Sequence, residues 1–178
     1  MKKMLLLVGM LAVSGLAFGN QVTANGNGQY EVEGDVIVKA KVVETLTMDG
    51  GNTFVDFGTL LRGQLNKPEV EAGQLTISGA PNTNIVITVK SPDTEKYQTM
   101  NEVVKGLGVD LKLNGNDATH KLSTTLNFKH NNAVINERVN ALDEKGKFVI
   151  DIHGLASANA QQAFGNYHET VKVKAQYE

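Results

Sequence analysis

The sequence predicts an all-β protein, built as a sandwich of antiparallel β-sheets. Apolar and polar residues alternate along many short segments, which is the period-two pattern of half-buried strands. Clusters of Gly, Asn, Asp and Pro separate these segments at intervals of roughly 10–15 residues, and no long segment has a helical period. Together these features favour about nine strands packed as two sheets in a single domain.

The composition narrows the class of protein. The chain has 178 residues, of which 41% are apolar, and this is enough for one domain with a core. A formal net charge of −2, with no basic cluster beyond Lys2 and Lys3, gives no indication of nucleic-acid binding. The chain has no cysteine, so its core alone must stabilise it.

The first residues read as an export signal. Met1–Gly19 combines two lysines, an apolar run too short to span a bilayer comfortably, and small residues at its end. We expect cleavage before Asn20, with cleavage after Ala24 as the alternative. Residues 20–34 are polar and Gly-rich, so we expect a flexible leader with a short strand at Tyr30–Val32.

A long β run follows at Asp35–Met48. Apolar residues alternate up to Val43, and then the phase slips, which suggests two strands in series. The first of these strands, at about 35–43, presents one apolar face made of Val36, Val38, Ala40 and Val42. It can be read as a strand that pairs with another molecule or as the first strand of a complete domain.

The middle of the chain supplies the other strands. We expect them at Thr53–Leu60, Val70–Ser78, Asn84–Lys90, Gly108–Leu113, Lys121–Phe128, Ala133–Leu142 and Lys147–His153. The expected connections are a turn at Asp49–Asn52, loops at Leu61–Glu69 and Ser91–Gly106 (the second with room for one helical turn), a primed hairpin turn at Asn114–Asp117, and a short helix within the Ala-rich stretch Gly154–Phe164.

The last stretch, Gly165–Glu178, has the clearest alternation. One face of the extended chain carries Tyr167, Glu169, Val171, Val173, Ala175 and Tyr177, and the other face is polar. Glu169 is the single charge on the apolar face. We therefore expect one final half-buried strand, whose outer edge needs a partner.

This stretch resembles the C-terminal signature of chaperone–usher pilus subunits. The signature has a Gly fourteen residues from the end, here Gly165, then alternating apolar residues and a penultimate Tyr, here Tyr177. The resemblance implies an incomplete immunoglobulin-like sandwich that lacks its own final strand. It assigns an acceptor groove to the C-terminal strand, namely Gly165, Tyr167, Val171, Val173, Ala175 and Tyr177. The absence of cysteine is similar to the colonisation-factor branch of the family.

The resemblance also implies a function. The chain would be a structural subunit of a surface pilus that supports adhesion, exported through the periplasm with the help of a periplasmic chaperone and an outer-membrane usher. Neighbouring subunits, in a homopolymer, would donate the segment at about 35–43, with Val36, Val38, Ala40 and Val42 as its buried side chains. Burying four such side chains is worth roughly 4–10 kcal/mol before ordering costs. No cofactor, metal or catalytic residue is expected.

Two other functions compete with this one. The chain could be a self-contained secreted or periplasmic sandwich that binds a glycan or a protein. It could also be an exported enzyme, but its four histidines have no metal-ligand spacing and no nucleophile-elbow motif is present. Asp151 and His153, which share a strand face, are the nearest approach to a catalytic pair. The turns at Asp49–Asn52 and Asn114–Asp117 lack the acidic density of a calcium loop.

Overall fold

The computed structural model describes residues 21–24, 30–33, 39–40, 42–94 and 96–178, and it divides the chain into two units. The first unit, Met1–Val43, contains an antiparallel hairpin of β1 (Gln21–Ala24) and β2 (Tyr30–Glu33). The expected short strand at Tyr30–Val32 is thus present, and it has a partner that the sequence analysis did not predict. The expected signal segment and two donor residues, Val36 and Val38, lie outside the described residues.

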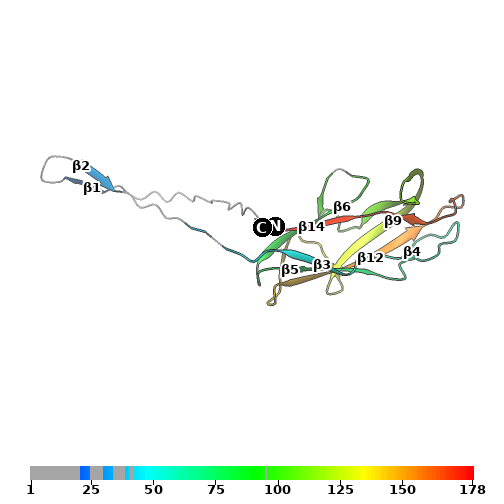
Figure 1. Ribbon diagram of the computed structural model, residues 1–178, viewed down its shortest axis with the longest axis horizontal. Helices are drawn as coiled ribbons and strands as arrows, with labels where there is room; N and C mark the ends of the chain where they lie inside the picture. Colours follow the sequence, from blue (N-terminus) through cyan, green and yellow to red (C-terminus); the bar gives the residue numbers. More distant parts are fainter. Residues whose placement is uncertain (1–20, 25–29, 34–38, 41, 95) are drawn as a thin grey trace, which may run out of the picture. The chain divides into compact units, whose positions relative to one another are not determined.

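The second unit, Glu44–Glu178, is all-β and has two antiparallel sheets packed against each other, as predicted (Figure 1). The larger sheet has eight strands. Its main order is β13 (Tyr167–His168), β8 (Leu107–Leu113), β9 (Asp117–His130), β12 (Lys147–Ser157), β5 (Gly73–Ser78) and β3 (Thr47–Asn52). Two short strands join it at the sides, β10 (Ala133–Val134) on β9 and β4 (Lys67–Pro68) on β12. None of the described residues is helical, and hence no described helix could cross a membrane.

The smaller sheet has four strands and covers one face of the larger one. Its order is β11 (Val139–Ala141), β6 (Asn84–Lys90) and β14 (Lys172–Tyr177), with β7 (Gln98–Thr99) also paired to β6. The side chains between the sheets form one apolar core, because alternate residues of each strand point inward. The largest fully buried side chains in it are those of Ile77, Ile85, Ile87, Val89, Met100, Leu142 and Ile150.

The hairpin of β8 and β9 confirms the clearest local prediction. Asn114 and Gly115 both have positive φ, 53° and 75°, as a primed two-residue turn requires. The Asn116 N–H donates to the Leu113 carbonyl across this turn, at 3.4 Å. The strands expected at 84–90, 108–113, 121–128 and 147–153 are likewise present, with β9 and β12 extending beyond the predicted bounds.

Several predicted elements are wrong. Thr53–Leu60 is not a strand, since only Asp56 makes a bridge, with Glu71. Asp49–Asn52 is not a turn but the bulged end of β3. Ser91–Gly106 contains the unexpected strand β7, and the single turn for which there was room follows it, since the Val103 N–H donates to the Thr99 carbonyl at 3.3 Å. The Ala-rich stretch forms no helix, because Leu155, Ala156 and Ser157 continue β12 and pair with β9. The loop expected at 61–69 contains β4, and the strand expected at 133–142 is two short ones.

The run Gly165–Glu178 alternates as predicted, but it is two strands in different sheets. β13 pairs with β8 in the larger sheet, whereas β14 pairs with β6 in the smaller one. Gly165 precedes β13 with a φ of 143°, and a Cβ at this position would collide with the Leu113 side chain. Glycine is therefore required where the chain turns into this run.

Candidate functional site

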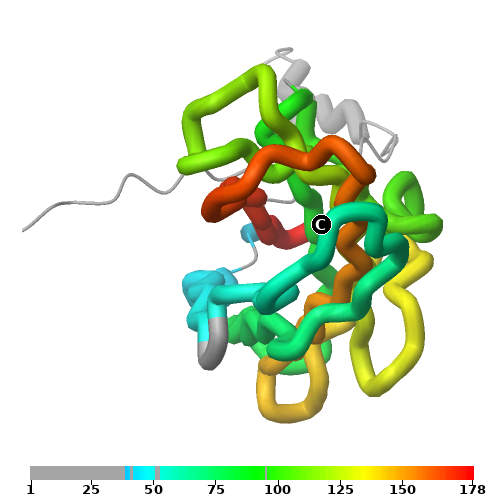
Figure 2. The backbone as a smooth tube through the Cα atoms, turned by 90° about the vertical axis from the view of Figure 1, so that its right-hand side faces the viewer, coloured from blue at the N-terminus to red at the C-terminus, as the bar shows by residue number. Residues whose placement is uncertain are grey.

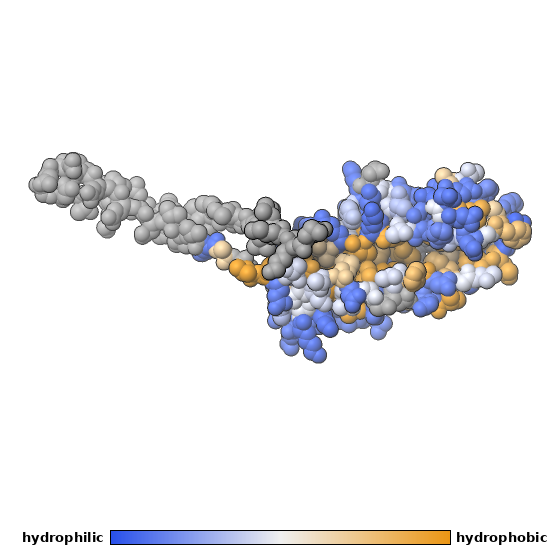
Figure 3. All heavy atoms as spheres, in the orientation of Figure 1, coloured by the Kyte–Doolittle hydropathy of each residue, from blue (hydrophilic) through white to orange (hydrophobic). Residues whose placement is uncertain are grey.

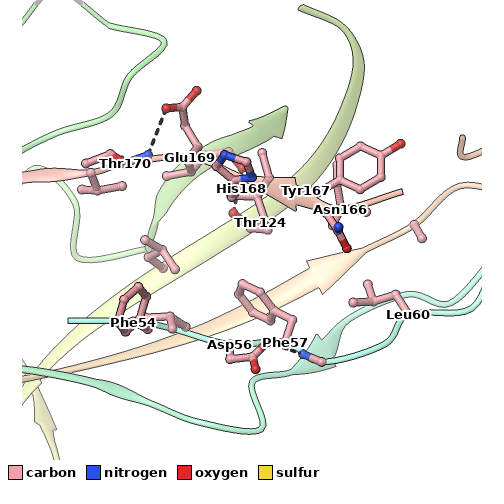
Figure 4. Close-up of a pocket in the computed structure, with 18 of the residues that line it drawn as sticks. Phe54, Asp56, Phe57, Leu60, Thr124, Asn166, Tyr167, His168, Glu169 and Thr170 are labelled. Carbon is pink, nitrogen blue, oxygen red and sulfur yellow. Dashed lines mark hydrogen bonds between the residues drawn. The ribbon is translucent and has the colours of Figure 1, made fainter. Parts of the chain in front are cut away.

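An apolar groove of about 1310 Å³ lies between two stretches of the Glu44–Glu178 unit. Residues 162–171 with Val173 form one wall, and Met48 with residues 53–62 forms the other. In Figure 4 the labelled residues Asn166–Thr170 face Phe54–Leu60 across the groove, with Thr124 behind them. Figure 2 traces the backbone of these two stretches, in orange-red and in cyan to teal, and in Figure 3 apolar residues form a band between the two layers. The volume exceeds the roughly 300–1,000 Å³ of small-molecule sites, so the groove suits a polypeptide segment.

The floor of the groove is the core of the sandwich. It consists of apolar side chains from the larger sheet, namely Leu75, Val109, Leu111, Leu122, Leu126, Phe128 and Ile152, together with Phe57. The buried polar residue Thr124 also lies in this floor, and its hydroxyl donates to the Val109 carbonyl at 2.7 Å. Because the Thr124 hydroxyl already has a partner within the protein, it needs no hydrogen bond from a bound group. The floor therefore remains suited to apolar side chains.

The strand β14, which contributes Val173 to the first wall, has one free edge. Among the described residues, β14 pairs only with β6. The Glu178 N–H donates to the Asn84 carbonyl at 3.1 Å, on the β6 side. Because N–H and C=O groups alternate between the two edges of a strand, the backbone groups of Val173 and Ala175 point to the other edge. Their side chains pack on the core, so β14 presents both an open backbone ladder and apolar side chains.

The opposite wall, residues 53–60, is held from behind. Asp56 donates its N–H to the Glu71 carbonyl at 2.9 Å, and its own carbonyl accepts from Val70 at 2.7 Å. The ammonium group of Lys67 donates to the carbonyls of Phe57 and Thr59, at 2.6 and 2.7 Å. These contacts fix an irregular segment as a wall without making it a strand. Sequence reasoning missed Lys67 because nothing in the local pattern marks a lysine that binds carbonyls.

Most of the predicted acceptor residues come together here. Gly165, Tyr167, Val171 and Val173 line the groove. Ala175 and Tyr177 do not, although both pack against the same core.

Tyr177 instead links the C-terminal strand to the first residue of the domain through hydrogen bonds of its hydroxyl group. Its hydroxyl accepts from the Ala80 N–H at 2.8 Å and donates to the Glu44 carbonyl at 2.7 Å. The side chain of Leu46 lies beside it, over Gly79. The domain therefore begins, at Glu44, beside the C-terminal end of β14.

The predicted donor residues are only partly described. Ala40 and Val42 are exposed and belong to no strand, and Val42 is 88% exposed. Their role as donors, like that of Val36 and Val38, stays a prediction.

The far end of the groove contains a contact that sequence analysis did not predict. The Arg62 guanidinium lies over the Phe164 ring, 3.8 Å from its centroid, and Arg62 Nε donates to the Gln162 carbonyl at 2.6 Å. Gln162 is itself fixed, because it is buried and its amide donates to the Lys121 carbonyl and the Tyr167 hydroxyl. The two walls are thus joined at this end. No sequence signal could have found the pair, since its members lie far apart in the chain and neither belongs to a motif.

The one charge on the apolar face of the final run is neutralised locally. Glu169 accepts from the Lys112 ammonium at 2.8 Å, and both side chains are largely buried. The hydrogen bond from Lys112 lowers the pKa of Glu169, and the same bond raises the pKa of Lys112. Paired in this way, Glu169 can line the groove as a carboxylate without an isolated buried charge.

The histidines and carboxylates outside the groove make structural contacts. The Asp151 carboxylate accepts from Gln74, whereas His153 Nδ1 donates to Glu69 at 2.7 Å. Asp151 and His153, the nearest approach to a catalytic pair, thus each bind a different side chain. Glu69 also accepts from the Gly154 N–H at 2.9 Å, so its carboxylate fastens the loop at 61–69 to β12.

The Glu69 contacts predict an acid dependence of stability. Burial raises the pKa of Glu69, but the hydrogen bonds from Gly154 and His153 together outweigh it, and the folded-state pKa lies below the ordinary 4.5. A lowered pKa means that the stabilisation is fully present above about pH 4.5 and disappears as the pH falls through the folded value. Glu69→Gln should lower the free energy of unfolding by about 1 kcal/mol at pH 7 and by much less near pH 3. Urea unfolding at both pH values measures this, with the exposed Glu137→Gln as control, and an equal loss at both would contradict it.

By fold and site, the chain belongs to the class of all-β sandwiches that have an apolar groove beside a strand with an open edge. No protein-family model matches the chain, and no curated protein matches its sequence.

Proposed function

We propose that the chain is a structural subunit of a cell-surface fibre, in which the groove of each copy takes up segment 35–43 of the next copy as an added strand. The observation that carries this proposal is the free edge of β14 above an apolar groove. An added strand needs a backbone ladder and pockets for alternate side chains, and this groove offers both. A groove that held a small ligand would not need the open backbone edge.

The length of the groove wall agrees with the length of the proposed donor segment. The wall from Gly165 to Val173 and the segment from Asp35 to Val43 contain equal numbers of residues. An extended segment of this length covers roughly 30 Å at about 3.3 Å per residue. The segment alternates small apolar residues with Lys39 and Lys41, so its apolar face would enter the groove while the lysines stay in solvent.

Protection by a chaperone, assembly by an usher and export to the cell surface belong to the same proposal. Subunits that expose such a groove before assembly need protection, because an open strand edge over an apolar surface promotes aggregation. A periplasmic chaperone that fills the groove temporarily, and an outer-membrane usher that exchanges it for the next copy, would meet this need. Export of the chain to the cell surface, with adhesion as the purpose of the fibre, follows from the resemblance of residues 165–178 to pilus subunits.

The test is to remove the proposed donor strand. A chain beginning at Asn20 should form long polymers, and replacement of residues 35–43 by a Gly/Ser sequence of equal length should abolish them, as seen by electron microscopy and light scattering. The altered chain should be poorly soluble until a peptide of residues 35–43 is added. Grafting the same residues to the C-terminus through a flexible linker should give a stable monomer.

The competing function predicts a different outcome when residues 35–43 are replaced. A self-contained sandwich that binds a glycan or a protein would remain monomeric and fold cooperatively with residues 35–43 replaced. It would also gain no stability from the peptide, and that outcome would overturn the proposal.

A further inference from the structure

The end of the groove at Arg62 carries exposed apolar side chains that the proposed strand does not need. We call this surface the end patch, and it consists of Leu61, Arg62, Leu65 and Phe164. Leu61, Leu65 and Phe164 are 71%, 68% and 81% exposed, so this surface is apolar and in contact with water. It surrounds a cation, because the Arg62 guanidinium lies over Phe164. Apolar surface gathered around an arginine is the composition expected of a protein contact.

The patch is rigidly supported. The turn at 61–64 is closed by reciprocal hydrogen bonds, since Leu61 donates to the Gln64 side chain at 2.9 Å and Gln64 donates to the Leu61 carbonyl at 3.0 Å. The same turn is bound to the chain that follows β12 through Ala158, which donates to the Gln64 carbonyl at 2.8 Å. Because the backbone of this turn is already fixed, little further backbone entropy is lost when the surface is covered.

The position of Glu44 decides which part of a second copy can reach the patch. The Glu44 carbonyl is bound to Tyr177, so segment 35–43 leaves its own domain at the Tyr177 end. The end patch marks the opposite end of the groove, where Arg62 and Phe164 line it. A donated strand antiparallel to β14 therefore ends at the patch, with Val43 and then Glu44 emerging there.

The other orientation cannot continue into a fibre. A donated strand parallel to β14 would bring the Tyr177 ends of two copies together, although each of these ends must also release its own donor segment. Contacts between two different ends, by contrast, repeat without limit and give an open chain. Fibre growth thus selects the antiparallel arrangement.

We propose that the end patch is the docking surface for the base of the donor segment of a second copy, and that Arg62 there pairs with that copy's Glu44. This inference rests on the proposed function, because it needs the groove to be filled by a neighbour. Glu44 is exposed, and it is the first charge after Val43. Arg62 uses its Nε in the bond to Gln162, and the planar guanidinium has further N–H groups for a carboxylate. The apolar members of the patch cover the residues around the pair.

Cysteine cross-linking tests the contact, because the chain contains no cysteine of its own. A Glu44→Cys chain and an Arg62→Cys chain are mixed, assembled and treated with a bismaleimide linker. The expected product is a mixed dimer of the two variants; a linker is needed because an arginine–glutamate pair holds its Cα atoms farther apart than the roughly 4.4–6.8 Å that a direct disulfide requires. Dimers formed between two Glu44→Cys copies would indicate the parallel arrangement and overturn the inference, and so would polymers without any cross-link.

Charge exchange tests the pair itself. Arg62→Glu and Glu44→Arg should each speed the dissociation of assembled polymers roughly two- to fivefold at low salt, and the double variant should restore the original rate. Single changes without effect, or a double variant no better than the singles, would overturn the pairing. Arg62→Glu should weaken the binding of a C-terminally amidated 35–44 peptide more than that of the 35–43 peptide, because only the longer peptide contains Glu44. If neither peptide binds the unaltered chain, the proposed function fails instead.

Discussion

A 35–43 peptide that carries Val38→Asp should bind the groove at least about a hundredfold more weakly than the unchanged peptide. The reason is the floor of the groove, where Leu126, Phe128 and Ile152 offer no partner to a carboxylate. An unpaired charge in such a place loses its hydration and gains nothing in return. Val38 is one of the four residues on the face that we expect to enter the groove.

The matched control lies one residue away. Ile37→Asp also exchanges a β-branched apolar residue for a carboxylate, but on the opposite face of an extended peptide. It should change the affinity by no more than about threefold, because the side chain stays in solvent. Affinity is read from the rise in soluble, folded protein with peptide concentration, using the chain whose residues 35–43 are replaced by Gly/Ser. A larger loss of affinity for Ile37→Asp than for Val38→Asp would place the opposite face of the peptide in the groove. Equal losses of affinity for the two peptides would mean that the peptide does not bind as a strand.

The sequence analysis predicted the parts of the fold that local alternation determines. The hairpin of β8 and β9, the strand at 84–90 and the apolar face of the last run all follow from period two and turn chemistry. The alternation also placed Tyr167, Val171 and Val173 on one face, and these residues, with Gly165, line the groove; their role as acceptors, which the family resemblance implies, stays a prediction. A strand that lines a groove has the same pattern as any half-buried strand.

The failures arise where partners distant in sequence decide the structure. Thr53–Leu60 is rich in the apolar and β-branched residues typical of a strand, yet it borders the groove, and the Lys67 ammonium donates to two of its carbonyls. The Ala-rich stretch after Gly154 favours a helix locally, but pairing with β9 holds its first residues in β12. The change of sheet within the run 165–178 leaves the alternation unbroken, and so no pattern could reveal it.

Ile87→Ala should unfold the Glu44–Glu178 unit unless its groove is filled. Ile87 is fully buried in β6, opposite Ala175 of β14. Removing three buried carbons in such a core costs about 2–5 kcal/mol. A complete domain of this size has roughly 5–15 kcal/mol of stability and would survive the change. A sandwich with an unfilled groove of about 1310 Å³ starts from less, because the side chains that line that groove lack the packing contacts that an added strand would supply.

Added peptide should therefore decide whether the variant folds. Peptide 35–43 at a hundred times its dissociation constant contributes about 2.7 kcal/mol, which is enough to offset much of the loss. Thermal melts of the Gly/Ser-replaced chain should show no cooperative transition for Ile87→Ala alone and a restored one with peptide. The half-exposed Val134→Ala should melt within a few degrees of the parent in both conditions. A variant that melts cooperatively alone, at a midpoint that the peptide does not raise, would contradict the expectation, because the empty groove would then cost the domain nothing.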